Sequence, residues 1–182
     1  MKQLMITALM AVLVLLALLS APPLAVADDE IKARLRGVEE VPAVSTVASG
    51  RFRGEINNDS IAYELSYSGL EGAVRQAHIH VGQRGVNGAI VVFLCQTEFN
   101  RDPTNLAPFC PQSGTVTGTL RAANMTGLAV PQGIAPGQFA EFVKAIRAGV
   151  AYVNVHSAGA GDVAGNFTGG EIRGQIKADD DD

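Results

Sequence analysis

The three histidines of this 182-residue chain carry its clearest chemical signal. His78 and His80 are two residues apart in the segment AHIHV, and His156 ends the segment AYVNVH. Side chains two residues apart in a β-strand point to the same face, about 7 Å apart along the strand. Both segments alternate in this way, so all three imidazoles are expected on polar strand faces. Imidazoles from two strands can hold Zn²⁺ or Cu²⁺ and leave a fourth position for water.

Five further polar side chains are expected on the same strand faces, which leaves a second interpretation open. They are Tyr152, Asn154, Glu171, Arg173 and Gln175. Glu171 could serve as a fourth metal ligand in place of water. Alternatively, the histidines hydrogen-bond with this polar network, which would fix the strand register without binding a metal.

Signals for catalysis are weak, and no catalytic residue is assigned. Ser157 follows His156 directly, but the chain has no nucleophile elbow and no third member of a triad. Glu171 and Arg173 could do acid–base chemistry, but a surface ion pair is the better explanation of the two residues. The glycine-rich segment Gly82–Gly88 is not followed by a helix, so it lacks the geometry of a phosphate-binding loop.

The N-terminus has the layout of a secretory signal peptide. A basic residue, Lys2, precedes an apolar run from Leu4 to Leu19, and a small-residue cleavage site ends at Ala27. This predicts a signal peptide over residues 1–27. An uncleaved anchor is the alternative, because about 18 apolar residues can span a bilayer. Both alternatives place the rest of the protein outside the cytoplasm, as a secreted, periplasmic or cell-surface protein.

Composition argues against two kinds of partner. The chain has 14 Lys and Arg and 18 Asp and Glu, so the formal charge of −4 becomes −5 when Lys2 leaves with the signal peptide. An acidic chain without a basic cluster is a poor match for nucleic acid. Nothing after residue 27 is long and apolar enough to cross a membrane. Residues 178–182 are expected to form an acidic, disordered tail, and an extracellular protein partner is compatible with these features.

The two cysteines, Cys95 and Cys110, are predicted to form a disulfide across an irregular loop. In an oxidising compartment an isolated pair is most simply explained in this way. Two thiolate ligands for a metal are the alternative.

Periodicity predicts an all-β fold with one short amphipathic helix over Gln138–Arg147, in which apolar residues recur at helical spacing. Eight segments predict strands, separated by turns rich in Gly, Asn and Pro. The strands are expected at Ile31–Arg36, Gly50–Ile56, Ile61–Tyr67, Val74–Val81, Ala89–Cys95, Gly114–Arg121, Val150–His156 and Glu171–Ile176. Such a series is typical of one antiparallel β-sandwich or barrel, here over residues 28–177.

Segments of the chain also resemble the signature blocks of the CHRD domain family, which is named for its repeats in the animal protein chordin. They are LRGVEEVP at 35–42, HIHVGQRGVNGAIVVFL at 78–94, and AYVNVHS at 151–157 with GGEIRGQI at 169–176. The resemblance implies a secreted, single-domain protein of bacterial type with an immunoglobulin-like or barrel-like fold. The strong positions of the family correspond to His78, His80, His156, Glu171, Arg173 and Gln175. It implies no defined activity, and the growth factors bound by chordin are not transferred to this chain.

A second similarity, to copper/zinc superoxide dismutase, covers only Ala77–Gly82. The other ligands of a binuclear site have no counterparts, so dismutase activity is not expected. The sequence therefore favours a non-enzymatic, extracytoplasmic binding or structural module. The alternative is a mononuclear copper or zinc protein that uses the three histidines and could be redox-active. A hydrolase ranks third.

Overall fold

The computed structural model describes residues 29–158, 167 and 169–178. Over these residues the chain forms one antiparallel sheet of nine strands and a single α-helix, α2 (Phe139–Arg147). The strands are β1 (Asp29–Arg36), β2 (Ser49–Ile56), β3 (Ile61–Ser68), β4 (Val74–Val81), β5 (Ala89–Cys95), β6 (Gly114–Leu120), β7 (Ala151–Ser157), β8 (Ile172–Gln175) and β9 (Lys177–Ala178). Short 3-10 helices occupy Gly37–Glu39, Ala122–Asn124 and Val130–Gln132.

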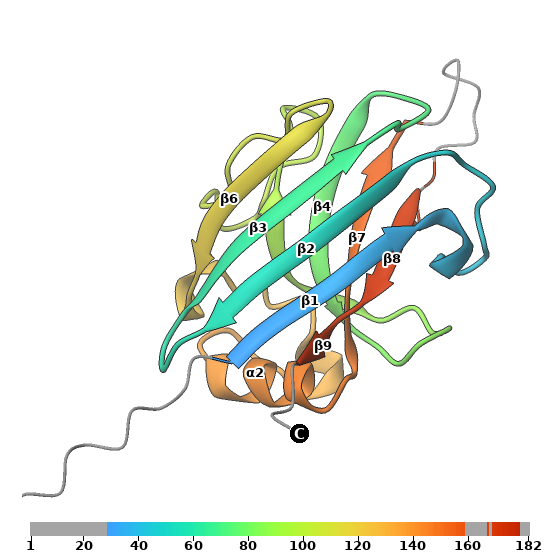
Figure 1. Cartoon of the computed structure of the whole chain (residues 1–182). Coiled ribbons are helices and arrows are strands. Elements are labelled where there is room, and N and C mark those ends of the chain that lie inside the picture. Colours follow the sequence, from blue (N-terminus) through green and yellow to red (C-terminus); the bar gives the residue numbers. More distant parts are fainter. Residues whose placement is uncertain (1–28, 159–166, 168, 179–182) are drawn as a thin grey trace, which may run out of the picture.

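The sheet folds over on itself into a nearly closed barrel (Figure 1). Its strand order is β5-β4-β7-β8-β1-β2-β3-β6, and β9 pairs with β1. The layer β6-β3-β2-β1 lies over the layer that contains β4, β7 and β8. In β1 and β2 buried and exposed residues alternate, which is the pattern of strands with one face on a core and the other in solvent.

The core lies between the two layers, and α2 covers one end of it (Figure 1). Fully buried side chains from both layers meet there, including Ile31, Leu35, Phe52, Leu65, Ile79 and Val153. The apolar side of α2 packs on the same core through four buried residues. They are Phe139, Phe142, Val143 and Ile146. The prediction of one amphipathic helix in an all-β fold is confirmed.

The eight predicted strands are all present, with one difference at the end of the chain. The predicted strand Glu171–Ile176 is shortened to β8, and the two-residue β9 follows it outside the predicted range; both pair with β1, at separate places. Gln175 and Ile176 lie where the two strands meet. The predictions for residues 1–27 and for most of the acidic tail lie outside the described residues. Among the described helices, none is long and apolar enough to span a membrane.

Strands β4, β5 and β7 are buried on both faces for most of their length. Burial on both faces fits the continuous apolar run Ala89–Cys95 that forms β5. In β4 and β7 the face that carries the histidines, which the sequence predicts to be polar, is covered by other parts of the chain and is not open to solvent. The segment 82–88, which follows β4, supplies part of that cover, as described below.

Cys95 and Cys110 form the predicted disulfide, with their Cα atoms 5.0 Å apart. The loop between them is mostly irregular and has its own internal support. The carboxylate of Asp102 accepts backbone hydrogen bonds from Thr104, Leu106 and Ala107. Asp102 is 3 % exposed, so these bonds hold the loop from within.

We expect the variant Cys95→Ala/Cys110→Ala to lose about 3 kcal/mol of unfolding free energy. The reason is that the disulfide closes a loop of about 15 residues, which restricts the unfolded chain. Urea unfolding of the variant and of the oxidised and reduced wild type would measure the loss. A loss below about 0.5 kcal/mol would contradict the expectation and would assign the order of the loop to Asp102 instead.

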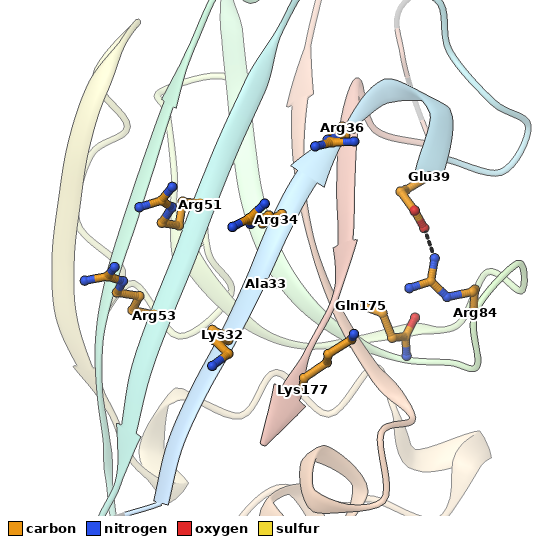
Figure 2. Close-up of a pocket in the computed structure, with 10 residues that line it drawn as sticks. All are labelled: Lys32, Ala33, Arg34, Arg36, Glu39, Arg51, Arg53, Arg84, Gln175 and Lys177. Carbon is orange, nitrogen blue, oxygen red and sulfur yellow. Dashed lines mark hydrogen bonds and ion pairs between the residues drawn. The ribbon is translucent and has the colours of Figure 1, made fainter. Parts of the chain in front are cut away.

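The fold also corrects one expectation from composition. The sequence contains no run of basic residues, yet the outer faces of β1 and β2 bring many of them together on one surface (Figure 2). Alternation in the two strands hides this cluster from a linear reading, because each cation is followed by a buried residue.

Candidate metal centre

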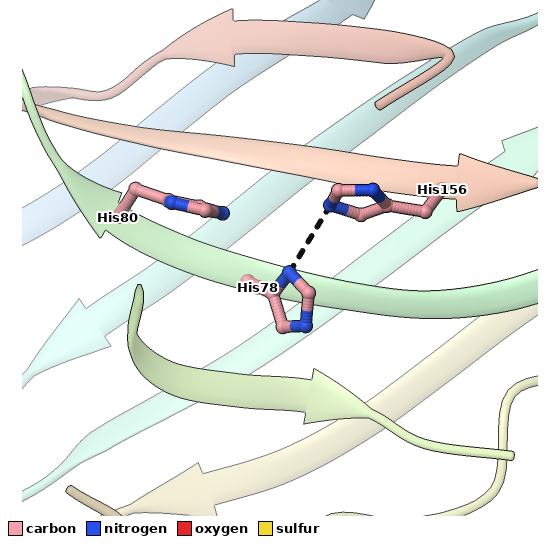
Figure 3. A group of neighbouring side chains, drawn as sticks. All are labelled: His78, His80 and His156. Atoms are coloured by element: carbon pink, nitrogen blue, oxygen red, sulfur yellow. Dashed lines mark hydrogen bonds between the residues drawn. The ribbon is translucent and has the colours of Figure 1, made fainter. Parts of the chain in front are cut away.

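His78, His80 and His156 come together on the covered outer face of β4 and β7 (Figure 3). One ring nitrogen from each residue can be chosen so that all three lie within 4.8 Å of one another. The closest approach is 3.2 Å, between Nδ1 of His78 and Nε2 of His156. All three side chains are buried. The structure therefore brings together every histidine of the chain, from two neighbouring strands.

Strand pairing accounts for this convergence. β4 and β7 are antiparallel neighbours, in which His80 lies opposite Tyr152 and His78 lies opposite Asn154. His156 is two residues beyond Asn154 and so shares its face. A register irregularity near the start of β4, between Val74 and Gln76, lies next to the pair Gln76–His156, and the β4–β7 register is regular from there to Val81. The alternate residues of both strands point into the barrel core instead.

His80 is held in one tautomer. Its Nδ1 lies 2.9 Å from the carbonyl oxygen of Gly88, and a carbonyl can only accept a hydrogen bond, so Nδ1 carries the proton. Burial lowers the pKa of His80 to about 4, although the bond to Gly88 acts in the opposite direction. The ring is therefore neutral at pH 7. Its Nε2 atom, which bears the lone pair, is buried without a hydrogen-bond partner.

His78 is the most deeply buried of the three, with no exposed surface. Burial lowers its pKa well below the usual value, and the neighbouring His156 and His80 lower it further. The ring of Phe93 packs edge-on against His78, with ring centroids 4.3 Å apart. Nε2 of His78 has no hydrogen-bond partner. The site thus contains two neutral imidazoles, each with a buried nitrogen that has no hydrogen-bond partner.

Aromatic and cationic side chains are stacked behind His80. Its ring lies parallel to that of Tyr152, with centroids 4.7 Å apart and an angle of 7° between the planes. The guanidinium carbon of Arg173 is 3.4 Å from the centroid of the Tyr152 ring. Since β7 lies between β4 and β8 in the sheet, Tyr152 separates the cation from the imidazole. This stack fixes the plane of the His80 ring.

Arg173 and Gln175 anchor the segment 82–88 over the site. The Arg173 guanidinium donates to the carbonyl oxygens of Gln83 (3.1 Å) and Val86 (2.9 Å). Gln175 Nε2 donates to the carbonyl of Gly82 at 3.0 Å. This segment carries the Gly88 carbonyl that orients His80. A Cβ on Gly88 would lie 1.6 Å from the Val81 oxygen, so glycine is required there.

Glu171 belongs to a different group of contacts. Its carboxylate accepts hydrogen bonds from Thr46 Oγ1 (2.6 Å), from the backbone N–H of Glu71 (3.1 Å) and from the Ser157 hydroxyl. Both carboxylate oxygens are occupied by these donors. Glu171 therefore joins β7 and β8 to two loops, and we do not include it among the metal ligands.

Glu40 is a buried acid beside the site that the sequence did not single out. It is 4 % exposed, and neither carboxylate oxygen has a hydrogen-bond partner. A Cβ on Gly170 would lie 2.1 Å from Glu40 Oε1 and 2.7 Å from Asn154 Nδ2, so the carboxylate and the amide converge there. Burial raises the pKa of Glu40 to about 8, although the positive charge of Arg173 opposes the shift.

The family model for the CHRD domain matches residues 31–176 of the chain. No curated protein gives a significant match. The matched region begins in β1 and ends between β8 and β9, so it contains all three histidines and Glu40.

Proposed function

The chain belongs to the CHRD domain family, and we propose that it is an extracytoplasmic module that binds one copper or zinc ion through His78, His80 and His156. One observation carries the proposal. Three buried imidazoles present ring nitrogens within 4.8 Å of one another, and His80 is oriented by the hydrogen bond from its Nδ1 to the Gly88 carbonyl.

The distances suit a single ion. Two ligands of a tetrahedral zinc ion with Zn–N bonds of 2.0–2.1 Å are about 3.3 Å apart. Nδ1 of His78 and Nε2 of His156 are 3.2 Å apart. In the metal-free protein one of these atoms donates a hydrogen bond to the other. With an ion bound, both atoms would be ligands and the proton would lie on the other nitrogen of its ring. Nε2 of His80, which has no partner, would be the third ligand.

The electrostatics of the site suit a metal as well. Metal ligands must be neutral imidazoles, and burial lowers the pKa values of His78 and His80, so no proton has to be removed from either ring at pH 7. A ligating histidine commonly donates its other N–H to a carbonyl. The Nδ1 contact of His80 with Gly88 has this arrangement. The proton on Nδ1 leaves Nε2 as the coordinating atom.

Imidazole ligands suit copper and zinc alike, and water would complete a three-histidine site. We assign no reaction to the ion. A binding or structural role in an oxidising compartment agrees with the disulfide. The proposal thus places the metal within the non-enzymatic module that the sequence favours, and an extracellular protein partner stays part of that hypothesis.

The test is elemental analysis of the protein purified without a histidine tag, followed by titration with Cu²⁺ and with Zn²⁺. We expect about one ion per chain in the wild type and none in His78→Ala/His80→Ala. Phe93→Leu is the matched control, because it alters packing against His78 without removing a nitrogen, and it should bind as the wild type does. A wild type that takes up neither ion would refute the metal site and leave the histidines with an architectural role.

A further inference from the structure

A second candidate site lies on the outer surface of β1, β2 and β9 and shares no residue with the histidine cluster (Figure 2). It is a hollow of about 480 Å³, which we call the cationic hollow. Seven cationic side chains line it, together with Ala33, Glu39 and Gln175. The cations are Lys32, Arg34, Arg36, Arg51, Arg53, Arg84 and Lys177.

The charge of the cationic hollow is opposite to that of the chain. It holds seven of the 14 lysines and arginines, against one carboxylate, that of Glu39. Its formal charge is therefore +6, whereas the whole chain carries −4. Glu39 is ion-paired with Arg84 at one side of the hollow (Figure 2). Of the remaining cations, all except Arg36 lie opposite another cation of the hollow in the strand pairs.

The strand register places like charges opposite one another. In the β1–β2 pair, Arg34 lies opposite Arg51 and Lys32 lies opposite Arg53. In the β1–β9 pair, Lys32 lies opposite Lys177. Like charges directly across an antiparallel pair destabilise a sheet. Folding therefore creates a repulsion here that a bound anion would relieve.

Five of the seven cations form no ion pair within the described part of the chain, although Arg53 lies opposite Glu64 in the β2–β3 pair. They are Arg34, Arg36, Arg51, Arg53 and Lys177. All are exposed. Guanidinium groups bind carboxylate, phosphate and sulfate through two parallel hydrogen bonds. The hollow therefore presents several guanidinium groups that form no ion pair within the described residues and can each bind an anion through two hydrogen bonds.

We propose that the cationic hollow binds an acidic polysaccharide, a linear sugar chain that bears carboxylate or sulfate groups. The row of cations on β1 runs from Lys32 to Arg36, about 13 Å at the usual rise per residue, which is long enough for several charged groups in sequence. The lining contains no aromatic residue on which nucleic-acid bases could stack. Its one apolar residue, Ala33, is buried, so it presents nothing to insert into a membrane.

The experiment measures binding of the full chain to dextran sulfate and to polygalacturonate, with neutral dextran as the reference polymer. The test variant is Arg34→Gln/Arg51→Gln. The matched control is Arg101→Gln/Lys144→Gln, which removes the same charge outside the hollow. We expect the wild type to bind one or both acidic polymers and not neutral dextran. The test variant should bind at least about tenfold more weakly, and the control should stay within about twofold of the wild type.

Several results would overturn the proposal. They are no binding of either acidic polymer, an equal loss in both double variants, and tighter binding of polythymidylate or of phosphatidylglycerol vesicles than of both polysaccharides. A thermal melt of each variant establishes that it is folded. Measurements with a chelator present keep the result independent of the proposed metal site, so each proposal can fail without the other.

Discussion

Copper or zinc is expected to raise the unfolding free energy of the protein by about 4 kcal/mol when the free ion is present at 1,000 times its Kd. The increment follows from mass action, because the three nitrogens converge only in the folded chain. In the unfolded chain His156 is 76 residues from His80. Denaturant unfolding with and without the ion, at fixed pH, measures the increment.

His80→Phe is the sharpest variant for this measurement. A phenyl ring can keep the stacking on Tyr152 but has no nitrogen to offer. The metal-dependent increment should therefore disappear, whatever the variant does to the stability of the metal-free protein. Phe93→Leu, which changes packing beside His78, should keep the increment. Equal increments in His80→Phe and the wild type would show that the ion binds elsewhere.

Metal-free wild-type protein should lose stability relative to Glu40→Gln as the pH rises from about 4.5 to about 8. Burial raises the pKa of Glu40 from 4.5 to about 8, so in this range the folded state binds a proton that the unfolded state releases. Stability falls with pH wherever the folded state binds more protons. At 1.36 kcal/mol per pH unit the change is at most about 5 kcal/mol.

The comparison with Glu40→Gln separates this effect from the histidines. Burial lowers the pKa values of His78 and His80, so the unfolded state binds more protons than the folded state as the pH falls below 6.5. The wild type and Glu40→Gln should therefore both lose unfolding free energy as the pH falls below 6.5. Only the wild type should also lose stability on going up to pH 8. Parallel pH profiles for the two proteins would mean that the Glu40 carboxylate is ionised in the fold.

The sequence predicts most of the sheet because alternation is a local property. Each strand of the layer β6-β3-β2-β1 shows its buried face directly in the order of its residues. The shared face of His78 and His80 follows from the same rule. The proximity of these two histidines to His156 does not follow from alternation, because it depends on β4 and β7 being neighbours in the sheet. That pairing is set by long-range packing, which no local pattern encodes.

Glu40 shows where local reasoning stops. It is chemically identical to its neighbour Glu39, which forms an ion pair at the surface. Strand β1 buries its odd-numbered residues, so continuing the alternation would expose Glu40. The 3-10 turn Gly37–Glu39 changes the phase and turns Glu40 inward. A single turn of helix therefore decides which of two adjacent acids lies beside the candidate metal centre.

The cationic hollow is not evident in the sequence for a related reason. Its cations are separated in the sequence by buried residues and by more than a hundred positions between β1 and β9. Only the register, with Arg34 opposite Arg51, shows that they form one surface. The net charge is a sum over the whole chain, so it does not reveal that a chain of negative net charge carries a strongly positive surface.

The pairing of β1 with β8 and β9 has a consequence for the order of folding. β1 is the first described strand, yet one of its edges pairs with residues 172–178, the last described strands. Until they arrive, β1 and β7 each keep an edge whose backbone groups lack their final partners. Exposed edges of this kind recruit other chains, and contacts so distant in sequence form slowly. The chain is therefore most prone to aggregate while its final strands have not yet paired with β1 and β7.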